Sequence, residues 1–100
     1  MNYGLDIELL TQINNIFSHY PEIKSVIIFG SRAKGNFKPG SDIDLAIIGN
    51  ITPTIISQIY LQIDELNSPY KFDLINYNSI SNNDLLEHIN RIGKTIYSNS

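Results

Sequence analysis

Two short motifs in this sequence carry side chains that could do chemistry together. Gly30-Ser31-Arg32 forms a small, flexible turn of the size that holds a phosphate, and Asp42-Ile43-Asp44 begins eleven residues after the serine. Alternate residues of a strand point to the same face, so both carboxylates would share one face, with Cα atoms roughly 6.6 Å apart. Carboxylates held this close repel each other unless a positive charge lies between them. In an acidic chain without cysteine, we expect that charge to be Mg²⁺ carrying a nucleoside triphosphate.

The two aspartates of the second motif predict a metal site that phosphate oxygens complete. Mg²⁺ binds a few carboxylates together with phosphate oxygens rather than an all-protein cage. Two ions roughly 3.5–4 Å apart could clamp the attacking and leaving oxygens of an in-line phosphoryl displacement. At an effective dielectric constant near 20, two carboxylates about 4 Å apart repel by ~4 kcal/mol. We therefore expect the site to be weakly formed without metal.

Asp73 is a third acid that could join this site. It lies in the apolar segment Phe72-Asp73-Leu74-Ile75, where it could complete the metal site and take the proton from an attacking hydroxyl. Alternatively, it pairs with Lys71 or caps the edge of a sheet. His19 and His88 lie on predicted helices without partners at ligand spacing, so we expect both at the surface or boundary and assign neither to metal.

The turn at Gly30 and Ser31 predicts phosphate binding. Gly30 has no Cβ, so a ligand can approach its backbone closely, and a helix starting at Ser31 would direct free N–H groups at the strand end. Three of the seven basic residues follow within seven positions: Arg32, Lys34 and Lys38. Arg32 could equally bind phosphate or brace the fold by pairing with an acid, whereas Lys38 is typical of a solvated loop charge. Alone, the turn would be an ordinary strand-to-helix corner; the aspartates nearby favour chemistry.

The composition restricts the class of protein. One hundred residues predict a single domain, 1–100, and 42% hydrophobic residues suffice for a core. A net charge of −3 argues against direct binding to nucleic acid, and the absence of cysteine excludes disulfides and zinc-thiolate sites. Because no apolar run exceeds four residues and the N-terminus has no signal-like stretch, we expect a cytoplasmic protein without membrane spans.

The spacing of apolar residues predicts the elements that position the motifs. Apolar residues at steps of three and four predict a helix over 5–20 that ends before Pro21. The segments 24–29 and 43–48 are apolar on both faces and each is followed by glycine, which is typical of buried central strands. Between these strands we expect a short helix and then a Pro/Gly loop.

The second half of the chain continues the alternation of helix and strand. Thr52 and Pro53 predict an N-cap followed by proline at the first helical position. A third strand over 70–76 carries the lone acid. Ser81 and Asp84 resemble a capping box that opens a last helix, and a short tail strand could follow. This order predicts an α+β (α/β-like) fold with a small mixed sheet of three to four strands covered by helices; it does not fix the strand directions.

The motifs resemble the signature of the DNA polymerase β-like nucleotidyltransferase superfamily. The resemblance covers nearly the whole chain and rests on Phe29-Gly30-Ser31-Arg32-Ala33-Lys34-Gly35 and Gly40-Ser41-Asp42-Ile43-Asp44-Leu45. Within the superfamily, the sequence is most similar to minimal nucleotidyltransferases (MNT), antitoxin-type proteins that are usually paired with a HEPN-domain ribonuclease toxin. The resemblance implies that Gly30 and Ser31 bind the triphosphate, that Asp42 and Asp44 bind two Mg²⁺ ions, and that Asp73 acts as base or metal ligand.

The resemblance also implies an activity and a partner. Arg32 and Lys34 fall on usually basic positions near the phosphates, although Lys34 stands where arginine is common and lacks its planar fork. Members transfer AMP from ATP onto a tyrosine of the partner toxin and so silence it. Larger relatives add a helical domain that grips the base or acceptor. We expect none in this sequence, and the resemblance then implies that a partner supplies part of the site. We therefore expect a Mg²⁺-dependent nucleotidyltransferase and antitoxin in a hetero-oligomer.

Two alternatives to modification of a toxin stay open. The antitoxin could neutralise its toxin by occlusion, with a nucleotide site that is vestigial or only regulatory. Transfer to a small molecule such as an aminoglycoside is the other alternative, and the missing second domain disfavours it. The sequence gives neither the nucleobase preference, nor the acceptor residue and number of nucleotides added, nor the stoichiometry.

Overall fold

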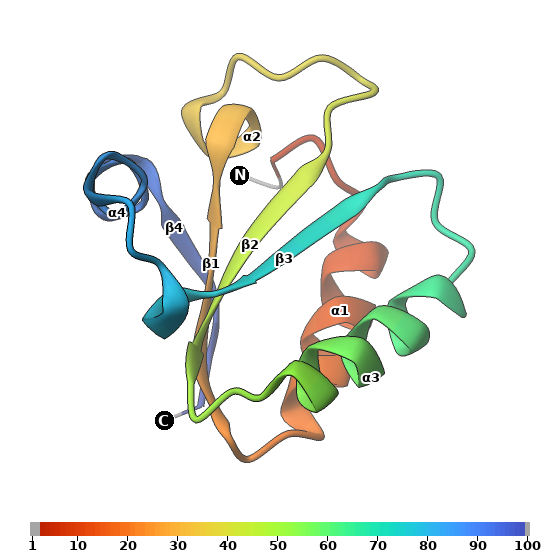
Figure 1. Cartoon of the computed structure of the whole chain (residues 1–100). Coiled ribbons are helices and arrows are strands. Elements are labelled where there is room, and N and C mark those ends of the chain that lie inside the picture. The colour runs from red at the N-terminus through yellow and green to blue at the C-terminus, as the bar shows by residue number, and fades with distance from the viewer. Residues whose placement is uncertain (1–2, 100) are drawn as a thin grey trace.

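A computed structural model describes residues 3–99, which form a mixed sheet with helices on both of its faces (Figure 1). In chain order the elements are α1 (Ile7–Ser18), β1 (Ile23–Phe29), α2 (Gly30–Lys34), β2 (Ile43–Gly49), α3 (Pro53–Asp64), β3 (Phe72–Asn76), the 3-10 turn η1 (Tyr77–Ser79), α4 (Asn83–Ile92) and β4 (Lys94–Ser98). None of the helices in this part of the chain is long and apolar enough to cross a membrane.

The sheet has the strand order β3-β2-β1-β4. β1 runs antiparallel to both β2 and β4, whereas β2 and β3 are parallel and are joined through α3. The predicted α+β fold is therefore confirmed, with the short tail as a true fourth strand. The two strands that were predicted to be central, β1 and β2, are the inner pair.

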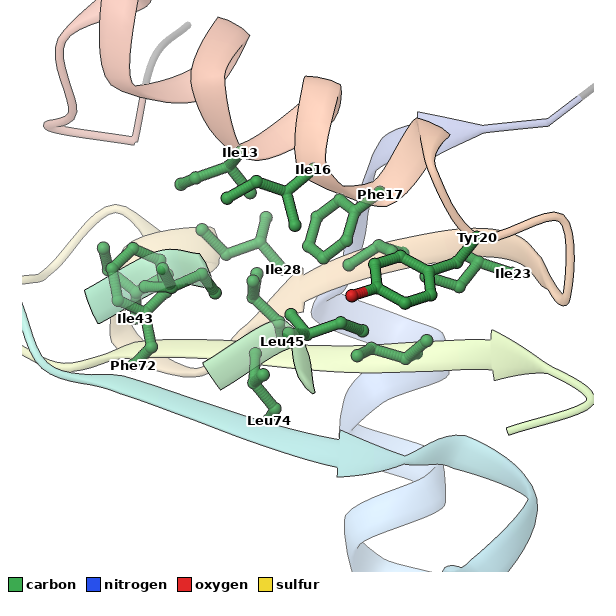
Figure 2. Close-up of a cluster of buried hydrophobic side chains, with 14 of the residues drawn as sticks. Ile13, Ile16, Phe17, Tyr20, Ile23, Ile28, Ile43, Leu45, Phe72 and Leu74 are labelled. Carbon is green, nitrogen blue, oxygen red and sulfur yellow. The ribbon is translucent and has the colours of Figure 1, made fainter. Parts of the chain in front are cut away.

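One face of the sheet carries the main hydrophobic core. α1 and α3 lie together on this face in Figure 1, and the alternate residues of the strands point toward them. Figure 2 shows Ile13, Ile16 and Phe17 of α1 directed at the sheet, where Leu45 and other strand residues meet them. Full burial of an aliphatic or aromatic side chain contributes about 1.5–3 kcal/mol, so this face supplies most of the stability.

The opposite face of the sheet carries a smaller cluster under α4. Phe29, Ala46 and Ile89 are buried there, with partly buried neighbours around them. These strand residues alternate with those of the main core, as a period of two requires. α4 thus covers only part of this face, and the strand ends that carry the acidic motif lie on the same side.

The helix starts show one prediction that holds and one that is wrong. The Thr52 hydroxyl accepts a hydrogen bond from the Ile55 N–H (3.2 Å), with proline in the first helical turn as predicted. The predicted capping box at Ser81 is wrong, because Asn82 is the N-cap of α4. Its side-chain oxygen accepts from the N–H groups of Asp84 (2.9 Å) and Leu85 (3.1 Å), and it lies next to the first helical residue, as a cap must.

Candidate active site

The structure brings two of the predicted acids side by side. Asp44 of β2 and Asp73 of β3 are register partners in the parallel pair, so their side chains leave the same face of the sheet. Residues two positions further along each strand, Ala46 and Ile75, belong to the cluster under α4, which identifies that face. Asp42 lies two residues before Asp44, immediately ahead of β2, and is exposed.

The charges of these acids act on one another. Burial raises the pKa of Asp44 above its ordinary value, the negative charges of Asp73 and Asp42 raise it further, and His88 acts weakly in the opposite direction. Asp44 is half-buried, whereas Asp42 and Asp73 are exposed. Repulsion among the three acids therefore outweighs the attraction of the histidine, and a cation placed between them would be stabilised.

The corner at the end of β1 lies directly against this acidic group. Phe29 is the register partner of Asp44, and α2 begins at the next residue, Gly30. Gly30 has a φ of +75°, and a Cβ at this position would overlap the Asp44 carboxylate. Only glycine satisfies both the backbone angle and the close approach. Ser31 follows Gly30 directly in the first turn of α2 and is partly buried.

Arg32 is almost completely buried, with 1% of its surface exposed. Its guanidinium donates to the carbonyl oxygens of Tyr3 (2.8 Å) and Ser41 (2.9 Å) and lies 4.9 Å from the ring centroids of Phe37 and Tyr70. Of its two predicted roles, this position favours the brace, and we assign Arg32 no contact with phosphate. Its partners are backbone carbonyls and aromatic rings instead of the acid that was expected, and they fix the loop that leads to Asp42.

The other two basic residues near the corner are exposed. Lys34 occupies the last turn of α2, three residues after Ser31, and its side chain is exposed. The backbone N–H of Lys38 donates to the Ser41 hydroxyl (2.9 Å), which shapes the loop, while its side chain is exposed as predicted for a solvated loop charge.

His88 contacts the corner, a position that its sequence context did not indicate. The Gly30 N–H donates to Nε2 of His88 (3.2 Å), and the imidazole lies edge-on to the Phe29 ring, 6.2 Å between centroids. His88 is partly buried, as expected for a boundary residue. The available signal was its place on the inner stripe of α4, three residues after Leu85 and next to Ile89.

The acids alone do not form a closed metal cage. Among residues 3–99, no group of three or more His, Cys, Asp or Glu side chains is arranged to hold a metal ion. The donor set nevertheless fits Mg²⁺, because this ion binds few carboxylates and takes its remaining ligands from phosphate and water. The register pairing of Asp44 with Asp73 supports this fit, because it holds two carboxylates side by side. Burial first, and then the charges of Asp73 and Asp42, raise the pKa of Asp44, and a cation would offset that repulsion. Asp42 and Asp44, with Asp73 beside them, are the residues that would hold it.

The sequence matches a known family over most of its length. The family model described as "Polymerase beta, Nucleotidyltransferase" matches residues 11–100, which include the Gly-Ser corner and all three aspartates. The chain belongs to this family of nucleotidyltransferases. A search of curated proteins gives no match.

Solved structures share the fold at low sequence identity. A chain in a crystal structure of a toxin–antitoxin with AMP-PNP superposes with a TM-score of 0.72 at 18% identity, covering 96% of this chain and 76% of that one. A chain of the tri-AMPylated Shewanella oneidensis HEPN toxin in complex with MNT antitoxin gives 0.66 at 18% identity, covering 92% and 71%. A chain of the toxin–antitoxin MntA–HepT gives 0.67 at 17% identity, covering 94% and 74%. These likenesses establish the nucleotidyltransferase fold.

Proposed function

We propose that this chain transfers AMP from ATP to a tyrosine hydroxyl of a partner HEPN toxin, in a Mg²⁺-dependent reaction, and so acts as its antitoxin. The observation that carries the proposal is the placement of Asp44 and Asp73 side by side next to the Gly30-Ser31 corner. Membership of the nucleotidyltransferase family supports the reaction type. The structural neighbours support the partner, because they include a toxin–antitoxin with AMP-PNP and an AMPylated HEPN toxin in complex with MNT antitoxin.

Each residue near the corner has a distinct part in this reaction. Gly30 and Ser31 bind the β- and γ-phosphates through the backbone and the serine hydroxyl, and Lys34 adds positive charge from solvent. Asp42 and Asp44 would hold two Mg²⁺ ions, which would supply positive charge for the triphosphate and the leaving group. We expect this reaction in the cytoplasm, since it consumes ATP.

Asp73 is the group that we assign to the proton transfer. It is exposed, so an incoming hydroxyl can reach it, and it stands next to Asp44 in the sheet register. The tyrosine oxygen attacks the α-phosphorus of ATP while the bond to pyrophosphate breaks, and the hydroxyl proton passes to the Asp73 carboxylate. AMP-tyrosine and pyrophosphate are the products.

The partner completes the site in this proposal. α4 covers only part of the acidic face, and two of the three acids are exposed. An acceptor tyrosine can therefore come from outside the chain, which a hetero-oligomer with the toxin would provide.

Intact mass spectrometry of the toxin tests the proposal. The pair is incubated with Mg²⁺ and ATP, and in parallel with a chain carrying Asp73→Asn. We expect the toxin to gain the mass of one or more nucleoside monophosphates with the wild-type chain and none with the variant. An unchanged toxin mass together with a tight complex would contradict transfer and support neutralisation by occlusion.

A further inference from the structure

His88 supplies a hydrogen-bond acceptor that α2 lacks. The first N–H groups of a helix have no partner within the helix and are usually capped by a side chain. The N-cap position of α2 is Phe29, whose side chain makes no capping hydrogen bond. The imidazole of His88, 58 residues later in the chain, accepts from the first of these groups, the Gly30 N–H, at 3.2 Å.

The same glycine sets the distance between the corner and the acids. Gly30 lies so close to the Asp44 carboxylate that a Cβ would overlap it. A shift of this backbone would therefore change the separation between the corner and Asp44 directly. The Phe29 ring packs edge-on against the imidazole, which limits how far His88 itself can move.

We propose that His88 is a positioning residue of the nucleotide site: its Nε2 fixes the Gly30 amide and so holds the Gly30-Ser31 corner at its distance from Asp44. The inference rests on the proposed function, because it assigns His88 to the site that binds the triphosphate. It makes α4 part of the site, although the helix carries none of the three acids.

Two substitutions distinguish the effect of the hydrogen-bond acceptor of His88 from the effect of its side-chain volume. His88→Gln keeps an acceptor with similar reach, whereas His88→Leu keeps apolar volume and removes the acceptor. His19→Leu is the matched control, since His19 is an exposed histidine at the end of α1. Calorimetric titration with AMP-PNP and Mg²⁺ measures affinity in the full chain, and NMR-detected hydrogen exchange measures protection of the Gly30 amide. Thermal denaturation shows that each variant is folded at the working temperature.

For His88→Leu we expect about tenfold weaker AMP-PNP binding, the usual size of one hydrogen bond lost from a buried group, and faster exchange of the Gly30 amide. His88→Gln should stay close to wild type in both measurements, and His19→Leu should equal wild type. Unchanged affinity of folded His88→Leu overturns the inference, even if the amide exchanges faster, because the contact would then be only a helix cap. A glutamine variant as weak as the leucine variant overturns it as well.

The controls separate this inference from the proposed function. If AMP-PNP binding responds to His88 as expected while the toxin stays unmodified, the transfer proposal fails alone. If the wild-type chain binds AMP-PNP in neither the free state nor the complex, both fail.

Discussion

The two faces of the sheet differ in how many apolar residues they bury and in the charges they carry. The face under α1 and α3 buries a cluster of 17 hydrophobic residues, whereas the cluster under α4 has three. Asp44 and Asp73 lie near the ends of their strands on the side of the smaller cluster, next to the glycine corner. A chain of 100 residues can tolerate mutual repulsion among these acids because the other face provides the favourable burial.

A single strand contributes side chains to both faces of the sheet. In β2, Ile43, Leu45 and Ile47 belong to the main core, while Asp44 and Ala46 point to the other side. A shift of one residue in register would move the acid into the core and the apolar residues into the site. The packing of the first face therefore fixes the position of the site on the second.

The largest expected effect comes from Asp44→Asn. We expect transfer to fall by at least about a thousandfold, because a bound metal supplies several kcal/mol of transition-state stabilisation. The fold should be kept, and its free energy of unfolding at neutral pH should be unchanged or higher, since the substitution removes a repelled carboxylate. Toxin mass and urea denaturation measure the two quantities. Normal transfer by the folded variant would remove Asp44 from the site.

Phe17→Ala should lower stability and leave nucleotide affinity unchanged, the reverse of Asp44→Asn. Phe17 is completely buried in the main core, so we expect a loss of about 3–5 kcal/mol in the free energy of unfolding. Ile7→Ala, on the same helix but 69% exposed in the wild type, should change it by no more than about 0.5 kcal/mol. AMP-PNP affinity of the folded fraction should stay constant in both. If the folded Phe17→Ala chain lost AMP-PNP affinity, the main core would contribute directly to nucleotide binding, contrary to this expectation.

Arg32→Lys tests whether the buried guanidinium stabilises the loop that leads to Asp42. We expect about 2 kcal/mol of lost stability, because an ammonium group cannot replace the planar fork that reaches the Tyr3 and Ser41 carbonyls. Lys34→Met, on the exposed side of α2, should leave stability within about 0.5 kcal/mol of wild type. Urea denaturation measures both. Equal stability of Arg32→Lys and wild type would mean that the buried guanidinium does not stabilise the loop.

The smallest expected effect is a pH dependence of stability that Asp44 causes. Its folded-state pKa is raised, so its favourable contribution is fully present below the unfolded-state pKa and is lost as the pH rises through the folded-state pKa. We therefore expect wild type to lose stability relative to Asp44→Asn as the pH increases through this window. Urea denaturation in a pH series, in the absence of divalent metal, measures the difference. A difference that grows in favour of wild type at higher pH has the wrong sign for this account.

Local patterns were sufficient to predict the elements, and they failed where distant segments meet. Apolar spacing predicted the helices and the two central strands, because burial imposes periods of 3.6 and 2. The strand directions and the pairing of β4 with β1 depend on contacts between distant parts of the chain, which spacing does not encode. The capping error at Ser81 arose because its neighbour Asn82 is an equally good cap.

The candidate site combines local and non-local features, and the roles of its residues stay predictions. The spacing of Asp42 and Asp44 and the glycine corner are local features, and the structure places Asp44 beside both Asp73 and Gly30. The carbonyl partners of Arg32 and the contact of His88 with Gly30 depend on distant parts of the chain. The sequence therefore left the role of Arg32 open, and for His88 it gave only a position on the inner stripe of α4.

We propose that three acids and a glycine-serine corner form one Mg²⁺-dependent nucleotide site. Calorimetric titration of AMP-PNP into the chain and into its toxin complex, with Mg²⁺ and then with excess chelator, tests it most directly. We expect saturable binding with Mg²⁺ that is lost with chelator and in Asp44→Asn. Binding that is equally strong with chelator, or no binding by either the chain or the complex, would contradict it.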